Sequence, residues 1–166
     1  MSQIRQARPE DVPAILGMVR DLAVYEREPD AVRMTEQQLA QALFGEHPAV
    51  FAHVAEDQGR LQGFALWFRT FSTWEGVHGI HLEDLYVRPE ARGAGHGRAL
   101  LQALARHAVA QGWARVEWSV LNWNEPSIGF YRSLGALPQD EWSVFRLTGD
   151  ALHRVGAARE HQPGRA

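Results

Sequence analysis

Apolar residues repeat along the chain at two spacings, which predict helices and strands in alternation. A period near 3.6 residues is typical of a helix with one buried face. The first such stretch begins at Pro9 and the second at Thr35, where Thr35 and Gln38 form a capping box. The first predicted helix begins at Pro9 and ends within YEREPD, where Pro29 stops it, and the others cover residues 35–44, 98–110 and 127–136.

Short runs of β-branched and aromatic residues, bounded by turn residues, predict strands. Two of these runs flank the turn at Asp57–Arg60, so we expect an antiparallel hairpin there. The predicted strands cover residues 3–7, 49–57, 61–71, 77–87, 114–121 and 142–148. This order of elements predicts an α/β domain with a mixed sheet over residues 1–155. Residues 156–166 lack an apolar period and are expected to form a flexible tail.

Composition narrows the class of protein. The chain has 166 residues, of which 45% are hydrophobic and 22% charged, as expected for a soluble globular protein. Its net charge of -3 gives no electrostatic footprint for nucleic acid or an anionic membrane, so neither is expected as a partner. No cysteine is present, and no apolar run is long enough to cross a bilayer. A cytoplasmic location is therefore expected.

The segment RGAGHG, residues 92–97, lies between a predicted strand and a predicted helix. Backbone N–H groups at a helix start are unpaired and favour anions, and glycines let a phosphate approach the backbone closely. The segment is neither a P-loop nor a dinucleotide-binding fingerprint, because GK[ST] and GxGxxG are both absent. The motif alone leaves a plain turn and a phosphate cradle equally open.

Seven motifs together resemble one family. The segments LAVYE, FGEHP, TWEG, LEDLYV, RGAGHG, NWNEPSIGFY and SLGA follow one another in the order found in the GCN5-related N-acetyltransferase (GNAT) superfamily. The similarity is to the branch of the spermidine/spermine (diamine) and thialysine acetyltransferases, over nearly all of residues 4–155. It implies a GNAT fold with a mixed and splayed central β-sheet flanked by helices. Small-molecule amines and a homodimer are the partners it implies.

The resemblance implies acetyl-CoA as co-substrate. The strands containing HLEDLYV and VEWSVL would separate and admit pantetheine, while the pyrophosphate would lie on the glycine loop. The residues expected to bind acetyl-CoA are Leu85, Tyr86, Val87, Arg92, Gly93, Ala94, Gly95, His96, Gly97, Arg98, Asn124 and Ser127. Asn124 and Ser127 also fit an ordinary turn or helix cap.

Amine acetylation requires a neutral amine and benefits from an acid at the leaving thiolate. Tyr131 is the candidate acid, and Glu83 is the candidate that takes the amine proton, directly or through water. Asp84 is expected to hold the substrate's ammonium. Neighbouring strand residues face opposite sides, so the two carboxylates act together only if the strand bulges, as it does in the family. Further residues expected at the acceptor are Tyr25, Glu26, Trp74, Glu117 and Ser119.

The identity of the acceptor stays open at this point. Arg27 and Arg33 lie among the acids of YEREPDAVR and would weaken attraction for a polycation, so a lysine-like amine is as plausible as spermidine. Ser72 stands where polyamine acetylators carry an acid. A non-catalytic acetyl-CoA-binding module and an enzyme acting on protein amines are the alternatives. No metal is expected, because the eight histidines form no recognised ligand motif.

Overall fold

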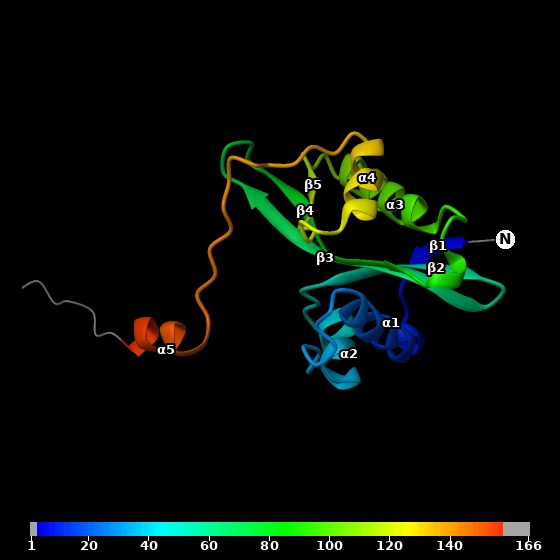
Figure 1. The fold of residues 1–166 in the computed structure, drawn as a ribbon, viewed down its shortest axis with the longest axis horizontal. Coiled ribbons are helices and arrows are strands. Elements are labelled where there is room, and N and C mark those ends of the chain that lie inside the picture. The colour runs from blue at the N-terminus through cyan, green and yellow to red at the C-terminus, as the bar shows by residue number, and fades with distance from the viewer. Residues whose placement is uncertain (1–2, 158–166) are drawn as a thin grey trace, which may run out of the picture. The chain divides into compact units, whose positions relative to one another are not determined.

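The computed structural model describes residues 3–157, and the chain divides into two compact units, residues 1–123 and 124–166. The first unit contains one five-stranded sheet in the order β1-β2-β3-β4-β5 (Figure 1). Neighbours are antiparallel except for β4 and β5, which run parallel, so the sheet is mixed. The strands are β1 (Gln3–Gln6), β2 (Phe51–Asp57), β3 (Arg60–Ser72), β4 (Val77–Val87) and β5 (Val116–Glu117).

Helices cover both faces of this sheet. One face carries α1 (Val12–Tyr25) and α2 (Glu36–Phe44), and the opposite face carries α3 (His96–Ala110) (Figure 1). Single 3-10 turns, η1 (Pro9–Asp11) and η2 (Pro89–Ala91), come directly after β1 and β4. The expected flanking of the sheet by helices is therefore confirmed. None of the helices within residues 3–157 is long and apolar enough to span a membrane.

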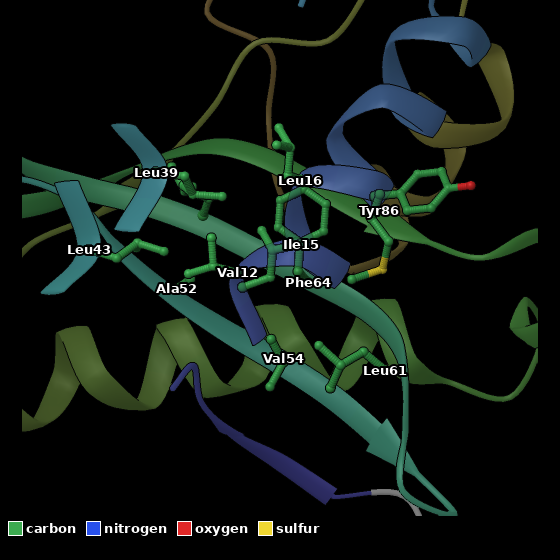
Figure 2. Packing of buried hydrophobic residues seen from close by; sticks show 12 residues of the cluster. Val12, Ile15, Leu16, Leu39, Leu43, Ala52, Val54, Leu61, Phe64 and Tyr86 are labelled. Carbon is green, nitrogen blue, oxygen red and sulfur yellow. The ribbon is translucent and has the colours of Figure 1, made fainter. Parts of the chain in front are cut away.

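The main core lies between α1, α2 and the sheet. Ile15, Leu16 and Leu39 project from the helices toward Phe64 of β3, and each of these side chains is at most 2% exposed (Figure 2). On the other face, α3 contributes a second buried row: Leu100, Leu101, Leu104 and Ala108. Burial on both faces explains why β2 and β3 are apolar almost continuously rather than at alternate positions.

Local sequence signals account for the helix ends. The Thr35 hydroxyl accepts from the Gln38 N–H at 3.2 Å, and the Gln38 side chain accepts from the Thr35 N–H at 2.9 Å. The predicted capping box is thus confirmed. Gly112 follows α3 with φ 68°, a conformation in which a side chain would be strained.

The second unit holds α4 (Glu125–Ser133) and α5 (Gly149–Ala157). The strand predicted over 142–148 is wrong, because these residues form no strand in the structure. Their alternation of apolar and polar residues fits a strand, but a strand also needs a partner. Helix α5 was not predicted and includes Gly156 and Ala157 of the expected tail, whose other residues, 158–166, lie outside the described part.

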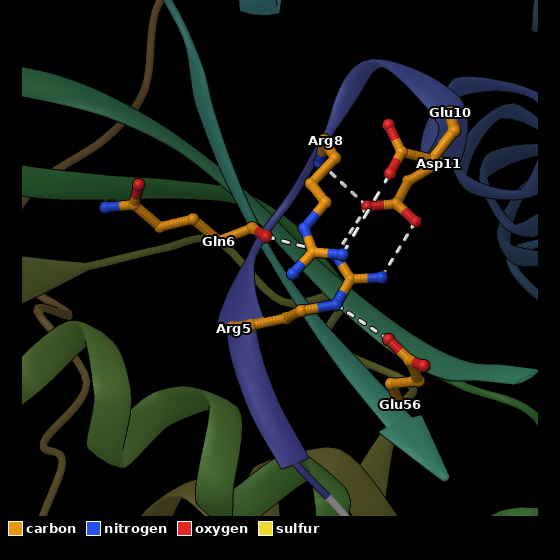
Figure 3. A network of polar contacts seen from close by, with 6 residues as sticks. All are labelled: Arg5, Gln6, Arg8, Glu10, Asp11 and Glu56. Carbon is orange, nitrogen blue, oxygen red and sulfur yellow. Dashed lines mark hydrogen bonds and ion pairs between the residues drawn. The ribbon is translucent and has the colours of Figure 1, made fainter. Parts of the chain in front are cut away.

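A buried ion-pair network ties β1 to the start of α1 (Figure 3). The Arg5 guanidinium donates to both Asp11 carboxylate oxygens at 2.7 and 3.0 Å, and to Glu56 of β2 at 2.7 Å. The Asp11 carboxylate also accepts from the Arg8 N–H at 2.7 Å. Burial alone would raise the pKa of Asp11, but the hydrogen bonds from Arg5 and Arg8 hold it below its ordinary value. The network fixes the direction in which α1 leaves the sheet.

Asp11→Ala should lower the free energy of unfolding by about 3 kcal/mol, because it leaves a buried arginine without its main partner. Glu10→Ala is the matched control, since Glu10 is exposed and 4.0 Å from Arg8, and should change stability by less than about 0.5 kcal/mol. Urea unfolding at pH 7 measures both.

The pH dependence of the same pair has a defined sign. A depressed pKa means that Asp11 stabilises the fold above pH 3.8 and that this contribution is lost as pH falls below it. Wild type should therefore lose more stability than Asp11→Ala on acidification from pH 5 to 3. An equal loss of stability in wild type and Asp11→Ala between pH 5 and 3 would contradict this account.

Candidate functional site

Strand β4 carries a β-bulge at Glu83. Its pairing with β3 runs Leu66 to Asp84 and then Trp67 to Leu82, so Glu83 is an extra residue without a partner position. Two residues of a bulged strand oppose one on its neighbour, and the normal alternation of side chains is interrupted. The bulge required for the two carboxylates to act together is therefore present.

Asp84 has the most perturbed carboxyl group at this bulge. Burial raises the pKa of Asp84 to about 6, and the negative charges of Glu83 and Glu26 add to the shift. Burial also raises the pKa of Glu26, which directly follows α1. The negative charge of Glu26, at the end of α1, acts on Asp84 in β4. The end of α1 and the bulge of β4 therefore form one acidic site. At neutral pH Asp84 is a carboxylate that binds a proton more readily than an ordinary one.

Glu83 has a different environment. Its side chain is 55% exposed, and its carboxylate lies 3.5 Å from Nε2 of His81. His81 in turn stacks on Phe68 of β3, with ring centroids 4.8 Å apart. Glu83 is therefore held at the surface of the site, whereas Asp84 lies deeper.

The sheet splays beside the bulge. Strands β4 and β5 pair only at Ile80 with Val116 and at His81 with Glu117. Residues 114–121 were predicted as a strand, but only Val116 and Glu117 form one, preceded by backbone hydrogen bonds from the Ala114 N–H to His78 O and from the Ile80 N–H to Arg115 O. The remainder of β4 therefore has its β5 side open, as the resemblance implied.

Backbone direction on β4 can be assigned from one hydrogen bond. The Arg88 N–H donates to Gln62 O at 2.8 Å, and backbone groups alternate sides along an antiparallel strand. Tyr86 therefore directs its backbone groups toward β3, while Leu85 and Val87 direct theirs to the open side. Among the three residues predicted to pair with pantetheine, Leu85 and Val87 have the right direction.

The glycine loop leads from β4 into α3. Gly93 and Gly95 have φ of 85° and 86°, and a Cβ atom at either would meet no atom within 4 Å. Gly95 is the N-cap of α3 and supplies no side-chain cap, so the first N–H groups of the helix face an open backbone cradle. Ala94 and Arg98 are exposed in or beside this cradle, Gly97 is partly buried, and His96 is buried.

Arg92 connects this loop with the end of α1. Its Nε donates to Val87 O at 3.0 Å, and its guanidinium lies 5.3 Å from the Tyr25 ring centroid and 5.8 Å from that of Tyr86. Tyr25 also contacts Trp123, with centroids 6.1 Å apart. Tyr25 therefore contacts Arg92 at the glycine loop and precedes Glu26 of the acidic site in the chain, and its role at the acceptor stays a prediction.

The other predicted acceptor residues come from the turn between β3 and β4 and from β5 and its end, where Glu117 is the register partner of His81. Trp74 is 88% exposed in the turn between β3 and β4, and the stretch of β4 from Val77 to Glu83 spans about 20 Å. Within one chain, Trp74 therefore does not reach the bulge. Glu117 pairs with Arg115 at 3.4 Å, and Ser119 is exposed beyond the end of β5.

Asn124, Ser127 and Tyr131 belong to the second unit, which is described by itself. Asn124 is the N-cap of α4, and its side chain accepts from the Ser127 N–H at 3.4 Å. The helix-cap alternative for Asn124 is thus present in the structure. Tyr131 lies on α4 beside Phe130, with ring centroids 5.4 Å apart. The cofactor and catalytic roles of these three residues stay predictions.

The sequence interpretation gave Arg27 only a repulsive effect on polycations and gave Trp123 no role at the site. The Arg27 guanidinium lies 4.2 Å from the Trp123 ring centroid. Arg27 directly follows the LAVYE motif and Trp123 lies in NWNEPSIGFY. The two residues are far apart in the chain, so no local sequence pattern predicts their contact. Within residues 3–157, no group of three or more histidines and acids is arranged to hold a metal ion.

Comparisons with known proteins agree with this geometry. A sequence profile of the acetyltransferase (GNAT) family matches residues 15–136. A thialysine N-epsilon-acetyltransferase of Sus scrofa is 37% identical over 92% of this chain and 95% of its own length. An L-ornithine N5-acetyltransferase of Arabidopsis thaliana is 33% identical over 93% and 87%, respectively.

Among solved structures, an integron cassette protein of V. cholerae superposes with a TM-score of 0.80 and 27% identity, covering 95% of this chain and 98% of its own. The family and branch inferred from the seven motifs are confirmed. With its splayed sheet, glycine cradle and matching profile, the chain belongs to the GNAT family of acetyltransferases.

Proposed function

We propose that this acetyltransferase transfers an acetyl group from acetyl-CoA directly to a primary amine of a small molecule, in a ternary complex. The observation that carries the proposal is the bulge in β4 near the point where its pairing with β5 ends, at which the pKa of Asp84 is raised to about 6. A proton acceptor therefore lies beside the slot in which a thioester would lie.

The residues of the slot fit acetyl-CoA. Leu85 offers its backbone C=O and Val87 its backbone N–H to the pantetheine amides, while Val87 O accepts from Arg92 Nε. The cradle of Gly93 and Gly95 offers N–H groups to the pyrophosphate. Acetyl-CoA supplies the acetyl group as an activated thioester. Arg92 adds positive charge at the loop while it contacts Tyr25 on the acceptor side.

Three groups of the protein share the chemistry. Asp84 takes the proton of the acceptor's ammonium, and the negative charge of Glu83 adds to the rise in the pKa of Asp84 that burial causes. The backbone N–H of Leu85 donates to the thioester oxygen as negative charge develops on it. The Tyr131 phenol protonates the departing thiolate, and the second proton that the nitrogen loses on becoming an amide restores the phenol. The structure supports Asp84 over Glu83 as the proton acceptor, because Asp84 is the deeper group and the one with the raised pKa.

A lysine-like amine is the favoured acceptor. The relatives named for thialysine and L-ornithine act on amino acids with a terminal amine, and the carboxyl group of Asp84 fits such an amine. A non-catalytic acetyl-CoA-binding module would have no use for the raised pKa of Asp84. Acetylation of protein amines is the remaining alternative, and a cytoplasmic location stays a prediction.

We also propose a homodimer. Several large apolar residues of the second unit are strongly exposed in the single chain, among them Phe145 at 94% and Val144 at 85%. Such residues are typical of a contact surface with another chain. Sedimentation equilibrium gives the mass directly, and a monomer at micromolar concentration would contradict the proposal.

Thiol release from acetyl-CoA should depend on the added amine. Lysine, thialysine and ornithine should each give turnover above the rate without amine, and spermidine should give less, because Arg27 and Arg33 repel a polycation. Colorimetric detection of free CoA measures this. Absence of release with every amine, in a protein that binds acetyl-CoA, would favour the non-catalytic alternative.

Asp84→Asn should lower kcat about 100-fold or more, because the proton acceptor is removed. In wild type, kcat/KM should decrease as the pH is lowered through about 6, because Asp84 becomes protonated there. Glu83→Gln is the matched control and should retain most turnover. If Glu83→Gln loses activity and Asp84→Asn does not, the roles are reversed.

The same substitution should stabilise the protein. The raised pKa of Asp84 means that folding favours its protonated form, so its contribution to stability is lost as pH rises from 3.8 through 6. Asp84→Asn should therefore raise the free energy of unfolding above that of wild type by on the order of 2 kcal/mol at pH 8, and should leave it unchanged below pH 3.8. Urea unfolding at both pH values measures the difference.

Tyr131→Phe should reduce kcat far more than it weakens acetyl-CoA binding, since the phenol acts on the leaving thiolate rather than on the bound cofactor. Calorimetric titration with acetyl-CoA provides the control. Unchanged turnover in this variant would remove Tyr131 from the mechanism.

A further inference from the structure

We propose that Arg27 binds the α-carboxylate of an amino-acid acceptor and thereby makes the enzyme discriminate amino acids from the corresponding diamines. This inference rests on the proposed acetylation of a small amine and identifies the residue that selects among such amines. It concerns the segment that directly follows α1, where Glu26 already joins the acidic site.

The backbone at Arg27 is one that normally takes glycine. The Arg27 N–H donates to Val24 O at 3.1 Å and the Glu28 N–H donates to Ala23 O at 2.9 Å, which together make a Schellman motif. Arg27 has φ 66°, in the left-handed region that is strained for a residue with a Cβ atom. A long charged side chain is thus held where glycine would fit the backbone better, which is typical of a position with a function.

The side chain is held in a defined place. Its guanidinium lies 4.2 Å from the centroid of Trp123, whose ring contacts Tyr25. An arginine supported on an aromatic face keeps its N–H edge available for a planar anion such as a carboxylate. The ion pairs within residues 3–157 do not include Arg27. The arginines that have a carboxylate within 4.0 Å are Arg5, Arg8, Arg60, Arg88 and Arg115.

The neighbouring charges match an α-amino acid. Glu26 is next to Arg27 in the chain, and its negative charge acts on Asp84 at the reaction site. An amino acid carries an ammonium and a carboxylate on one carbon, which Glu26 and Arg27 would meet as a pair. A diamine presents only a second cation there. Arg27 would repel that cation, so the residue selects both by attraction and by repulsion.

Two pairs of probes differ by this carboxylate alone: lysine with cadaverine, and ornithine with putrescine. In wild type, kcat/KM should be higher for each amino acid than for its diamine. In Arg27→Gly, the values for lysine and ornithine should fall roughly 30-fold, while those for the diamines stay level or rise. Arg27→Lys should restore part of the loss, because it returns the charge without the planar fork.

Stability separates this role from a structural one. Arg27→Gly removes the strain at positive φ, so its melting temperature should equal or exceed that of wild type. Arg106→Ala is the matched control, an exposed arginine on α3, which lies on the opposite face of the sheet from α1, and should change neither the substrate ratio nor the affinity for acetyl-CoA.

Each outcome has a definite meaning. Equal losses on amino acids and diamines in Arg27→Gly, or a lower melting temperature with an unchanged ratio, would overturn the role of Arg27 and leave the proposed acetylation standing. Wild type that acetylates none of the four amines would overturn the proposed function itself, and the role of Arg27 with it.

Discussion

The pairing of β4 with β5 ends after two residues, and the candidate site is arranged around that end. Parallel strands normally continue their hydrogen-bond ladder, because an unpaired buried edge is unfavourable. Here β4 extends to Val87 with its β5 side open, and the bulge at Glu83 lies where the strands part. An open edge of this kind is stable in a functional protein when a ligand completes it. In the proposed function, the amides of pantetheine complete this edge.

Other parts of the first unit hold this edge in position. Helices on both faces bury β2 and β3, so the sheet has little freedom to close the gap. The Arg5–Asp11 pair anchors the start of α1, and the far end of the same helix presents Tyr25 and Glu26 to the site. Arg92 joins that end to the glycine loop. Donor and acceptor sides are therefore fixed by the same packed scaffold.

Much of this arrangement was predictable from the chain. Apolar spacing and the Thr35–Gln38 capping box located the helices, because these signals are local. The bulge, the splay and the glycine cradle followed from resemblance to a family, since periodicity alone gives an unbroken strand over 77–87. The strand predicted over 142–148 was wrong, because an alternating pattern records the preference of a segment and not the presence of a partner strand.

The roles at the site were harder to predict for a physical reason. Glu83 and Asp84 are adjacent acids in the sequence, and only burial distinguishes them: Asp84 is the deeper group with the raised pKa. The positive φ of Arg27 and its contact with Trp123 depend on a helix end meeting a loop almost a hundred residues later. Such properties arise from tertiary structure and leave no local pattern.

Hydrogen exchange in the presence and absence of acetyl-CoA tests the central claim most directly. If the open side of β4 is the pantetheine slot, acetyl-CoA should slow exchange at the Leu85 and Val87 amides and at the amides of residues 93–98. The Tyr86 amide, directed toward β3, should change little. Protection of Tyr86 without Leu85 and Val87, or no change anywhere along β4 under saturating acetyl-CoA, would contradict the account.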